Sequence, residues 1–155
     1  MNKFNLRVYG ILINEKRQVL VSDELIRGMY ITKFPGGGLE FGEGPRDCLA
    51  REFKEELNLK IETEDHIYTT DYFQASAFNP GHQIISIYYK VKALEPILAP
   101  MRDTPFAFDE REMKMYEETG ETETFRLISL DEFSADCVTL PIDKIVAQLV
   151  LSFKC

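Results

Sequence analysis

Three glutamates stand in the sequence at a spacing that can hold a metal ion. Glu52, Glu55 and Glu56 occupy positions i, i+3 and i+4, so a helix would place their carboxylates on one side. Like charges at this spacing repel each other, and carboxylates beside an apolar helix face lose hydration. A divalent cation removes both costs, and Mg²⁺ prefers oxygen ligands from carboxylates and phosphates. The triplet therefore indicates half of a site that a metal ion and a phosphate group complete.

A glycine-rich segment precedes these glutamates. Gly36, Gly37 and Gly38 are consecutive, and glycine adopts backbone conformations that are closed to other residues. The segment can fold tightly over the start of a helix and turn a carbonyl toward a metal. Arg51 lies among the carboxylates and can orient one of them through a charge-assisted hydrogen bond. Each feature alone also has a plainer explanation, because a glycine triplet is most often a turn and glutamates on a helix are most often solvated.

The joint spacing of these residues resembles the Nudix box. The pattern of that box is G-x5-E-x7-R-E-U-x-E-E-x-G-U, where U is an aliphatic residue. In this chain it runs over residues 37–59, with Gly37, Glu43 and Arg51 at the first three fixed positions. The preceding Pro35 and Gly36 are also similar to the residues that lead into the box in the family. Fixed positions over so long a span make this resemblance specific.

Two positions depart from the pattern of the box. Phe53 stands at an aliphatic position, where it would face the core, so packing volume rather than catalysis is affected. Asn58 replaces the last glycine at the expected end of the helix. Asparagine tolerates a left-handed backbone better than other non-glycine residues. Neither departure removes a carboxylate, so we expect the chemistry of the box to be retained.

The resemblance implies a fold and an activity. The expected fold class is α/β, a Nudix-type α-β-α sandwich with a mixed β-sheet between helices. The expected activity is Mg²⁺-dependent hydrolysis, with Mn²⁺ as the other candidate ion, of a pyrophosphate linkage in a nucleoside triphosphate, a nucleotide sugar or ADP-ribose. Glu43 and Arg51 would fix the loop and orient Glu52. The implied metal ligands are the carbonyl of Gly36 and the carboxylates of Glu52, Glu55, Glu56 and Glu121.

Two kinds of role remain open between several residues. The general base that accepts a proton from the attacking water is Glu52, or else one of the later glutamates 118, 121 and 123. Simple solvation explains each of those later glutamates equally well. Ordinary strand packing likewise explains two of the candidate substrate contacts, Tyr9 and Phe34. The candidate substrate-binding residues lie in the early strands and loops and are Arg7, Tyr9, Arg27, Lys33 and Phe34.

The apolar pattern predicts the elements that position these residues. A helix is expected over residues 45–57, because Leu49, Phe53 and Leu57 recur every fourth residue and Pro45 suits a first turn. A short helix over 110–117 would lie in an irregular insertion over 96–120, and an amphipathic helix over 142–153 would close the chain. The expected strands are 6–13 paired as a hairpin with 19–21, then 29–34, 67–73, 83–91 and 123–128.

Composition limits the function further. The 155 residues suit a single domain over residues 1–155, and the formal net charge of -8 argues against binding a nucleic acid polymer. The three cysteines are too scattered for a disulfide framework, and no run is long enough to cross a bilayer. We therefore expect a cytoplasmic protein that acts on a small-molecule nucleotide without membrane contact. A homodimer is one candidate assembly.

Two other classes of function compete with hydrolysis. One is a Nudix-fold module that senses a nucleotide without cutting it, but such proteins generally lose carboxylates of the box and this chain keeps them. The other is a structural or partner-binding domain, which would leave the three glutamates and the glycine-rich loop without a use. Saturable nucleotide binding with no Mg²⁺-dependent product would favour the sensor.

Overall fold

The computed structural model describes residues 2–153. The chain folds into two compact units, each built from two separate stretches of sequence. The first unit comprises Met1–Leu12 and Pro35–Ile97, and the second comprises Ile13–Phe34 and Leu98–Cys155. The Nudix-box residues 37–59 all belong to the first unit. That residues 1–155 act as one domain stays a prediction.

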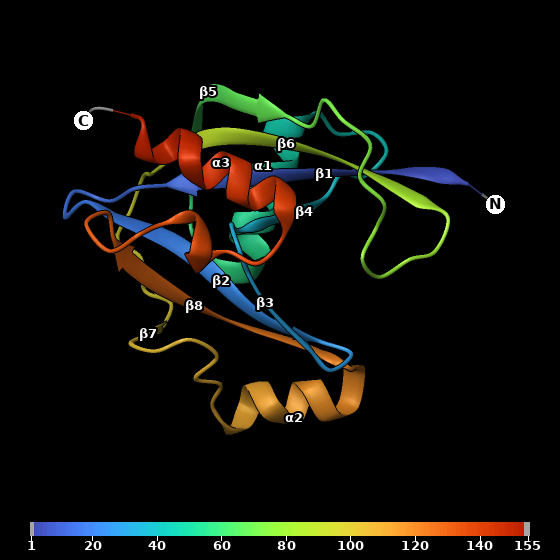
Figure 1. Ribbon diagram of the computed structural model, residues 1–155. Coiled ribbons are helices and arrows are strands. Elements are labelled where there is room, and N and C mark those ends of the chain that lie inside the picture. The colour runs from blue at the N-terminus through green and yellow to red at the C-terminus, as the bar shows by residue number, and fades with distance from the viewer. Residues whose placement is uncertain (1, 154–155) are drawn as a thin grey trace. The chain divides into compact units, whose positions relative to one another are not determined.

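The first unit contains a four-stranded sheet in the order β4-β1-β6-β5 (Figure 1). Its long central strands, β1 (Lys3–Leu12) and β6 (His82–Ala93), are parallel to each other. β4 (Gly36–Gly38) pairs with β1 and β5 (Ile61–Thr69) pairs with β6, both antiparallel. The sheet is therefore mixed, and β4 brings the glycine-rich segment against β1.

The helix that carries the box is α1 (Pro45–Leu57), with the predicted bounds confirmed. Its start is held by the Asp47 carboxylate, which accepts a hydrogen bond from the Gly44 amide at 2.9 Å. Its end is formed by Asn58, whose φ of 49° and ψ of 39° give the left-handed cap expected from the sequence. The asparagine thus performs the structural task of the glycine that the box usually has there.

α1 packs against β1 through Phe53, the second departure from the box. Phe53 is buried, and a Cβ atom added to Gly10 of β1 would lie 2.8 Å from its Cε1 atom. The ring therefore fits only because the facing strand position lacks a side chain. A larger residue in the box is matched by a smaller one on the neighbouring strand.

The second unit contains a four-stranded sheet in the order β3-β2-β8-β7. β7 and β8 are parallel and the other pairs are antiparallel, so this sheet is mixed as well. The predicted α/β class with mixed sheets is confirmed. The elements of this unit are β2 (Gln18–Ile26), β3 (Met29–Lys33), β7 (Met101–Arg102), α2 (Glu110–Thr119), β8 (Glu121–Ser129), the 3₁₀ helix η1 (Ala135–Cys137) and α3 (Pro141–Leu151).

Three predictions about strands were wrong. The predicted hairpin is reduced to one antiparallel bridge between Ile13 and Val19, because β1 pairs with β4 and β6 while β2 belongs to the other sheet. β5 spans Ile61–Thr69 rather than residues 67–73. It lies at the edge of its sheet and has no buried residue, which is why its apolar pattern is weak. The glycines 36–38 form a strand instead of only ending one.

The predicted helix in the insertion is confirmed as α2, and the closing helix is confirmed as α3, although α3 ends at Leu151 before Phe153. The strands predicted over 83–91 and 123–128 are confirmed as β6 and β8 with slightly wider bounds. Within residues 2–153, no helix has both the length and the apolar character needed to cross a membrane.

Candidate active site

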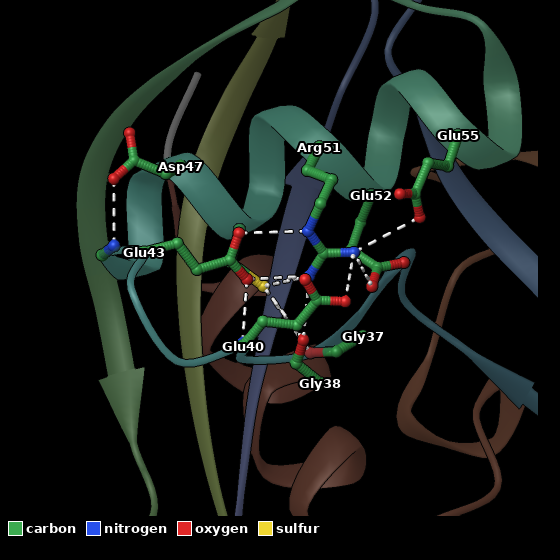
Figure 2. Close-up of polar contacts among 10 residues, drawn as sticks. Gly37, Gly38, Glu40, Glu43, Asp47, Arg51, Glu52 and Glu55 are labelled. Carbon is green, nitrogen blue, oxygen red and sulfur yellow. Dashed lines mark hydrogen bonds and ion pairs between the residues drawn. The ribbon is translucent and has the colours of Figure 1, made fainter.

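Arg51 lies at the centre of a cluster of carboxylates between α1 and the glycine-rich loop (Figure 2). Its guanidinium forms a bidentate pair with Glu43, with Nε donating to Oε2 at 3.0 Å and Nη2 donating to Oε1 at 2.8 Å. Two parallel charge-assisted bonds of this kind fix both side chains in position. Glu43 is thereby joined to the helix eight positions later in the sequence.

The same guanidinium reaches two of the box carboxylates. Its Nη1 atom donates to Glu52 Oε1 at 3.0 Å and to Glu55 Oε2 at 3.3 Å, and Glu40 Oε1 lies 3.6 Å away. Four carboxylates around one guanidinium leave three formal negative charges in this cluster. Glu52 is nearly buried, with 12% of its side chain exposed, whereas 59% of the Glu55 side chain is exposed. Such an excess of oxygen ligands suits a hard divalent cation.

Arg51 also ties the helix to the backbone of the loop. Its Nη2 atom donates to the carbonyl of Gly38 at 3.0 Å. The Cys48 thiol, one helical turn earlier, donates to the same carbonyl at 3.5 Å. The backbone amide of Glu40 donates to Glu43 at 2.9 Å, so the loop is held at both of its ends.

Two glycines allow this close contact between loop and helix. A Cβ atom on Gly37 would lie 2.5 Å from both Cδ and Oε1 of Glu52, so any side chain there would displace that carboxylate. Gly36 has a φ of 150°, and a Cβ atom on it would lie 2.1 Å from the carbonyl oxygen of Val8. The position of the Glu52 carboxylate therefore depends on a bare backbone at Gly37.

Two pKa values show what these groups can do. The hydrogen bonds from Arg51 and, secondarily, from the Glu40 amide lower the pKa of Glu43 to about 2. Glu43 therefore stays ionised and is a poor proton acceptor near neutral pH. Burial raises the pKa of the Cys48 thiol to about 12, so Cys48 stays protonated and acts as a hydrogen-bond donor rather than a nucleophile.

The other predicted residues of the first unit lie near the same loop. Glu56 is half-buried on α1. Arg7 stands opposite Gly38 in the pairing of β1 with β4, and its Nε atom donates to the Tyr9 hydroxyl at 2.6 Å. Tyr9 is buried, with its ring 5.4 Å from that of Tyr88. This favours the packing explanation for Tyr9, whereas Arg7 lies directly beside the glycine segment.

In the second unit, the predicted residue Lys33 belongs to a buried polar cluster. Its ammonium group pairs with Glu24 at 2.9 Å, and Glu24 lies directly across from Glu123 in the pairing of β2 with β8. The Ser22 hydroxyl donates to Glu123 at 2.9 Å. Burial first, and the charge of Glu24 second, raise the pKa of Glu123 to about 7, which Lys33 partly opposes. Sequence analysis missed Glu24, because only the strand register shows that it faces Glu123.

Three further predicted residues also lie in the second unit. Arg27 forms the turn between β2 and β3 with a φ of 46°. Phe34 is buried, and its ring lies 6.2 Å from that of Phe133. Glu121 is exposed at the start of β8. Their assigned roles in substrate or metal binding stay predictions.

The carboxylates of α1 converge on a guanidinium in this structure. Within residues 2–153, no group of three or more His, Cys, Asp or Glu side chains is arranged so that it could hold a metal ion. The physical reason lies in Arg51, whose donors occupy Glu43, Glu52 and Glu55. The metal ligands implied by the box therefore remain a prediction, and in this structure Glu52 and Glu55 lie against Arg51.

Comparison with known proteins identifies the family. The Nudix domain matches residues 3–149, which is nearly the whole chain. The RNA pyrophosphohydrolase of Ruthia magnifica subsp. Calyptogena magnifica is 43% identical over 54 residues, a region that covers 34% of this chain and 29% of that protein. The matched region is therefore less than a third of that relative's length.

Solved structures with low sequence identity share the fold. A Nudix hydrolase from Nitrosomonas europaea has a TM-score of 0.66 at 19% identity, covering 94% of this chain and 87% of the other. A MutT Nudix hydrolase from Burkholderia pseudomallei has a TM-score of 0.64 at 16% identity, covering 95% and 98%. Together with the domain match over residues 3–149, these findings show that the chain belongs to the Nudix hydrolase family.

Proposed function

We propose that this Nudix hydrolase cleaves a pyrophosphate linkage in a small nucleoside diphosphate derivative and depends on Mg²⁺, or on Mn²⁺ in its place. The observation that supports this most strongly is the contact of the Glu52 carboxylate with the bare backbone of Gly37. Beside that contact, four carboxylates surround one guanidinium. A site that only stabilised the fold would not need this excess of negative charge.

The residues present fit a divalent cation. The proposed ligands Glu52, Glu55, Glu56 and the Gly36 carbonyl supply only oxygen donors, which is the chemistry that Mg²⁺ selects. Gly37 has no side chain, so the Glu52 carboxylate can lie against the loop in the space that a Cβ atom would otherwise fill. When bound, the cation would neutralise phosphate charge and make a bound water more acidic. Glu121 is a further proposed ligand.

The chain's own side chains divide the remaining work. Arg51 holds Oε1 of Glu52 at 3.0 Å, which fixes the direction of that carboxylate. Its other oxygen, Oε2, accepts no hydrogen bond within residues 2–153 and is the atom that we assign to take the proton of the attacking water. Glu43 is held by Arg51 at a pKa of about 2, so its task is to position Arg51. Arg7, Arg27 and Lys33 are the proposed contacts for substrate phosphates, and Tyr9 and Phe34 are the proposed aromatic contacts.

The substrate is proposed to be a small nucleotide rather than a nucleic acid polymer. One relative is named for RNA, but the matched region covers only 29% of it. The net charge of -8 opposes binding to a polyanion, whereas a nucleotide of few phosphates can be neutralised by one or two cations. Nucleoside triphosphates, nucleotide sugars and ADP-ribose all remain members of the proposed substrate class.

A substrate panel tests this function. The purified full chain would be incubated with each nucleotide class and with a 5′-triphosphate RNA, with and without Mg²⁺, and the products separated by chromatography. We expect Mg²⁺-dependent release of a nucleoside monophosphate or of pyrophosphate from at least one small nucleotide. Saturable binding without any product would establish the sensor instead, and cleavage confined to the RNA would contradict the proposed substrate class.

Cytoplasmic location and a homodimeric state are also proposals. The charged fraction of 28% is close to that of an ordinary globular domain in water, which supports a protein that works in an aqueous compartment. Sedimentation velocity at several protein concentrations measures the oligomeric state directly. A single species with the mass of one chain at all concentrations would reject the dimer.

A further inference from the structure

The first unit contains a cavity of about 340 Å³ that the proposed mechanism does not use. Its lining residues come from the N-terminal end of β1, from the beginning of β6 and from the loop before β6. Figure 1 shows these two strand ends and the loop that projects beside them. Its size falls in the range of small-ligand sites, which is roughly 300–1,000 Å³. Phe4, Phe73, Lys3, His82 and Gln83 contribute to its lining.

The chemistry of this lining suits a planar, polar-edged ligand. Two phenylalanine rings border the cavity, and both are largely exposed to water, Phe4 by 65% and Phe73 by 71%. Exposed aromatic rings at a hollow provide faces on which a nucleobase stacks. The Gln83 side-chain amide can both donate and accept, and it forms no hydrogen bond within residues 2–153. Lys3 adds a positive charge at the rim in a chain that is otherwise acidic.

Two residues of the cavity's lining, Phe4 and Gln83, lie on the same face of the sheet as the Glu52 carboxylate. Val8 of β1 is paired with Gly37, whose Cα faces Glu52, and side chains at every second position of a strand share a face. Phe4 is therefore on the face of Val8, and its partner Gln83 on β6 lies on that face as well. Four residues of strand correspond to roughly 13 Å. An extended nucleoside diphosphate can span that separation.

We infer that this cavity binds the nucleobase of the substrate, with the base stacked on Phe4 and Phe73 and its polar edge against Gln83. The phosphates then extend along β1 toward the box carboxylates. This inference rests on the proposed function, because it assigns a place to the nucleoside part of the same substrate. It names the residues that select the base, for which the box itself provides no contacts.

Nucleotide binding to single-site variants tests the inference without any need for turnover. Adenosine, guanosine, cytidine and uridine monophosphates would be titrated into the full chain in Mg²⁺ buffer, with ribose 5-phosphate as the ligand that lacks a base. Backbone amide NMR shifts report the site, and calorimetry reports Kd. The variants are Phe4→Ala and Phe73→Ala, Phe73→Tyr to keep an aromatic ring, and Leu94→Ala as an exposed apolar control outside the cavity (49% exposed).

We expect the amides of Ala75, Gly81 and Gln83 to shift with at least one monophosphate and not with ribose 5-phosphate. Phe4→Ala and Phe73→Ala should each weaken binding of that monophosphate by about 5- to 150-fold, since stacking on one ring contributes about 1–3 kcal/mol per base. Phe73→Tyr and Leu94→Ala should bind like the wild type. Because both phenylalanines are exposed, thermal unfolding should be unchanged in every variant.

Unchanged affinity in both alanine variants, or equal shifts with ribose 5-phosphate, would overturn the inference. These outcomes are separable from failure of the proposed function. If the wild type hydrolyses a nucleotide with Mg²⁺ while KM is the same in the alanine variants, the function stands and the cavity assignment is wrong. If base binding depends on Phe4 and Phe73 but no nucleotide is cleaved, the cavity assignment stands and hydrolysis is wrong.

Discussion

The Glu52 carboxylate and the Cα of Gly37 are so close that a methyl group on Gly37 would stand 2.5 Å from the carboxylate oxygen. A carboxylate can approach the loop in this way only if the loop carries no side chain. This relationship explains why the box begins with a glycine. It also provides a direct way to move one carboxylate without removing it.

Gly37→Ala should therefore displace Glu52 and lower kcat while the charge of the site stays the same. A displacement of about 1 Å in a catalytic group costs about 100-fold in rate. Gly38→Ala is the matched control, because its Cβ would meet only Arg7 Nη1 at an ordinary 3.6 Å. Steady-state kinetics on the best nucleotide substrate would compare the two. Similar kcat values in both variants would show that the position of Glu52 does not matter.

The pairing of Glu43 with Arg51 predicts a pH dependence of stability. The pKa of Glu43 is lowered from 4.5 to about 2 in the folded chain, chiefly by Arg51. The pair of Glu43 with Arg51 stabilises the fold fully at pH values above 4.5, the pKa of Glu43 in the unfolded chain. This contribution to the free energy of unfolding is lost as the pH falls from about 4.5 toward 2. Urea unfolding across this pH range should show that the free energy of unfolding falls more steeply in the wild type than in Glu43→Gln. If the free energy of unfolding depended on pH in the same way in both proteins, the pair with Arg51 would not lower the pKa of Glu43.

Glu123 should produce the opposite dependence. Burial and the neighbouring Glu24 raise its pKa from 4.5 to about 7, so its contribution to stability is greatest below pH 4.5 and is lost as the pH rises toward 7. Glu123→Gln resembles the protonated acid and keeps an acceptor for Ser22. It should therefore be more stable than the wild type at pH 8, by about 1–3 kcal/mol, since one pKa unit corresponds to about 1.4 kcal/mol. Denaturant unfolding at pH 4 and pH 8 provides the comparison, and a variant less stable at pH 8 would contradict the assignment.

The match between Gly10 and Phe53 predicts a coupled pair. Gly10→Ala would place a methyl group 2.8 Å from the Phe53 ring and should lower the free energy of unfolding by about 1–3 kcal/mol through overpacking. Phe53→Leu restores the aliphatic residue usual in the box and leaves room for that methyl group. The double variant should recover part of the lost stability. Additive losses in thermal unfolding would show that the two sites do not share this space.

The sequence was sufficient for the local features of the box and insufficient for the pairing of strands. The bounds of α1 and the left-handed Asn58 follow from residues within one stretch of chain, so short-range rules predict them. The parallel pairing of β1 with β6 joins segments separated by most of the first unit, and no local pattern reveals it. The same limit explains why the predicted hairpin does not extend beyond the bridge between Ile13 and Val19.

The site shows the same division. The spacing of the box identified Glu43, Arg51 and Glu52 as a group, and these residues are in contact. Sequence gave no sign of Cys48 as a donor to the loop carbonyl, since a lone cysteine in a helix is usually a packing residue. It also gave no sign of Glu24, whose importance depends on the strand register opposite Glu123. Interactions set by tertiary register need coordinates.

The central claim is that the carboxylates of α1 bind a divalent ion together with a diphosphate group. Titration of the full chain with Mn²⁺ in the presence of a non-hydrolysable nucleoside diphosphate analogue, followed by paramagnetic broadening of backbone amides, measures this directly. The account predicts broadening at residues 36–38 and 51–56 in the wild type, and weaker or absent broadening in Glu55→Gln and Glu56→Gln. Broadening elsewhere, or none at these residues in the wild type, would contradict the claim.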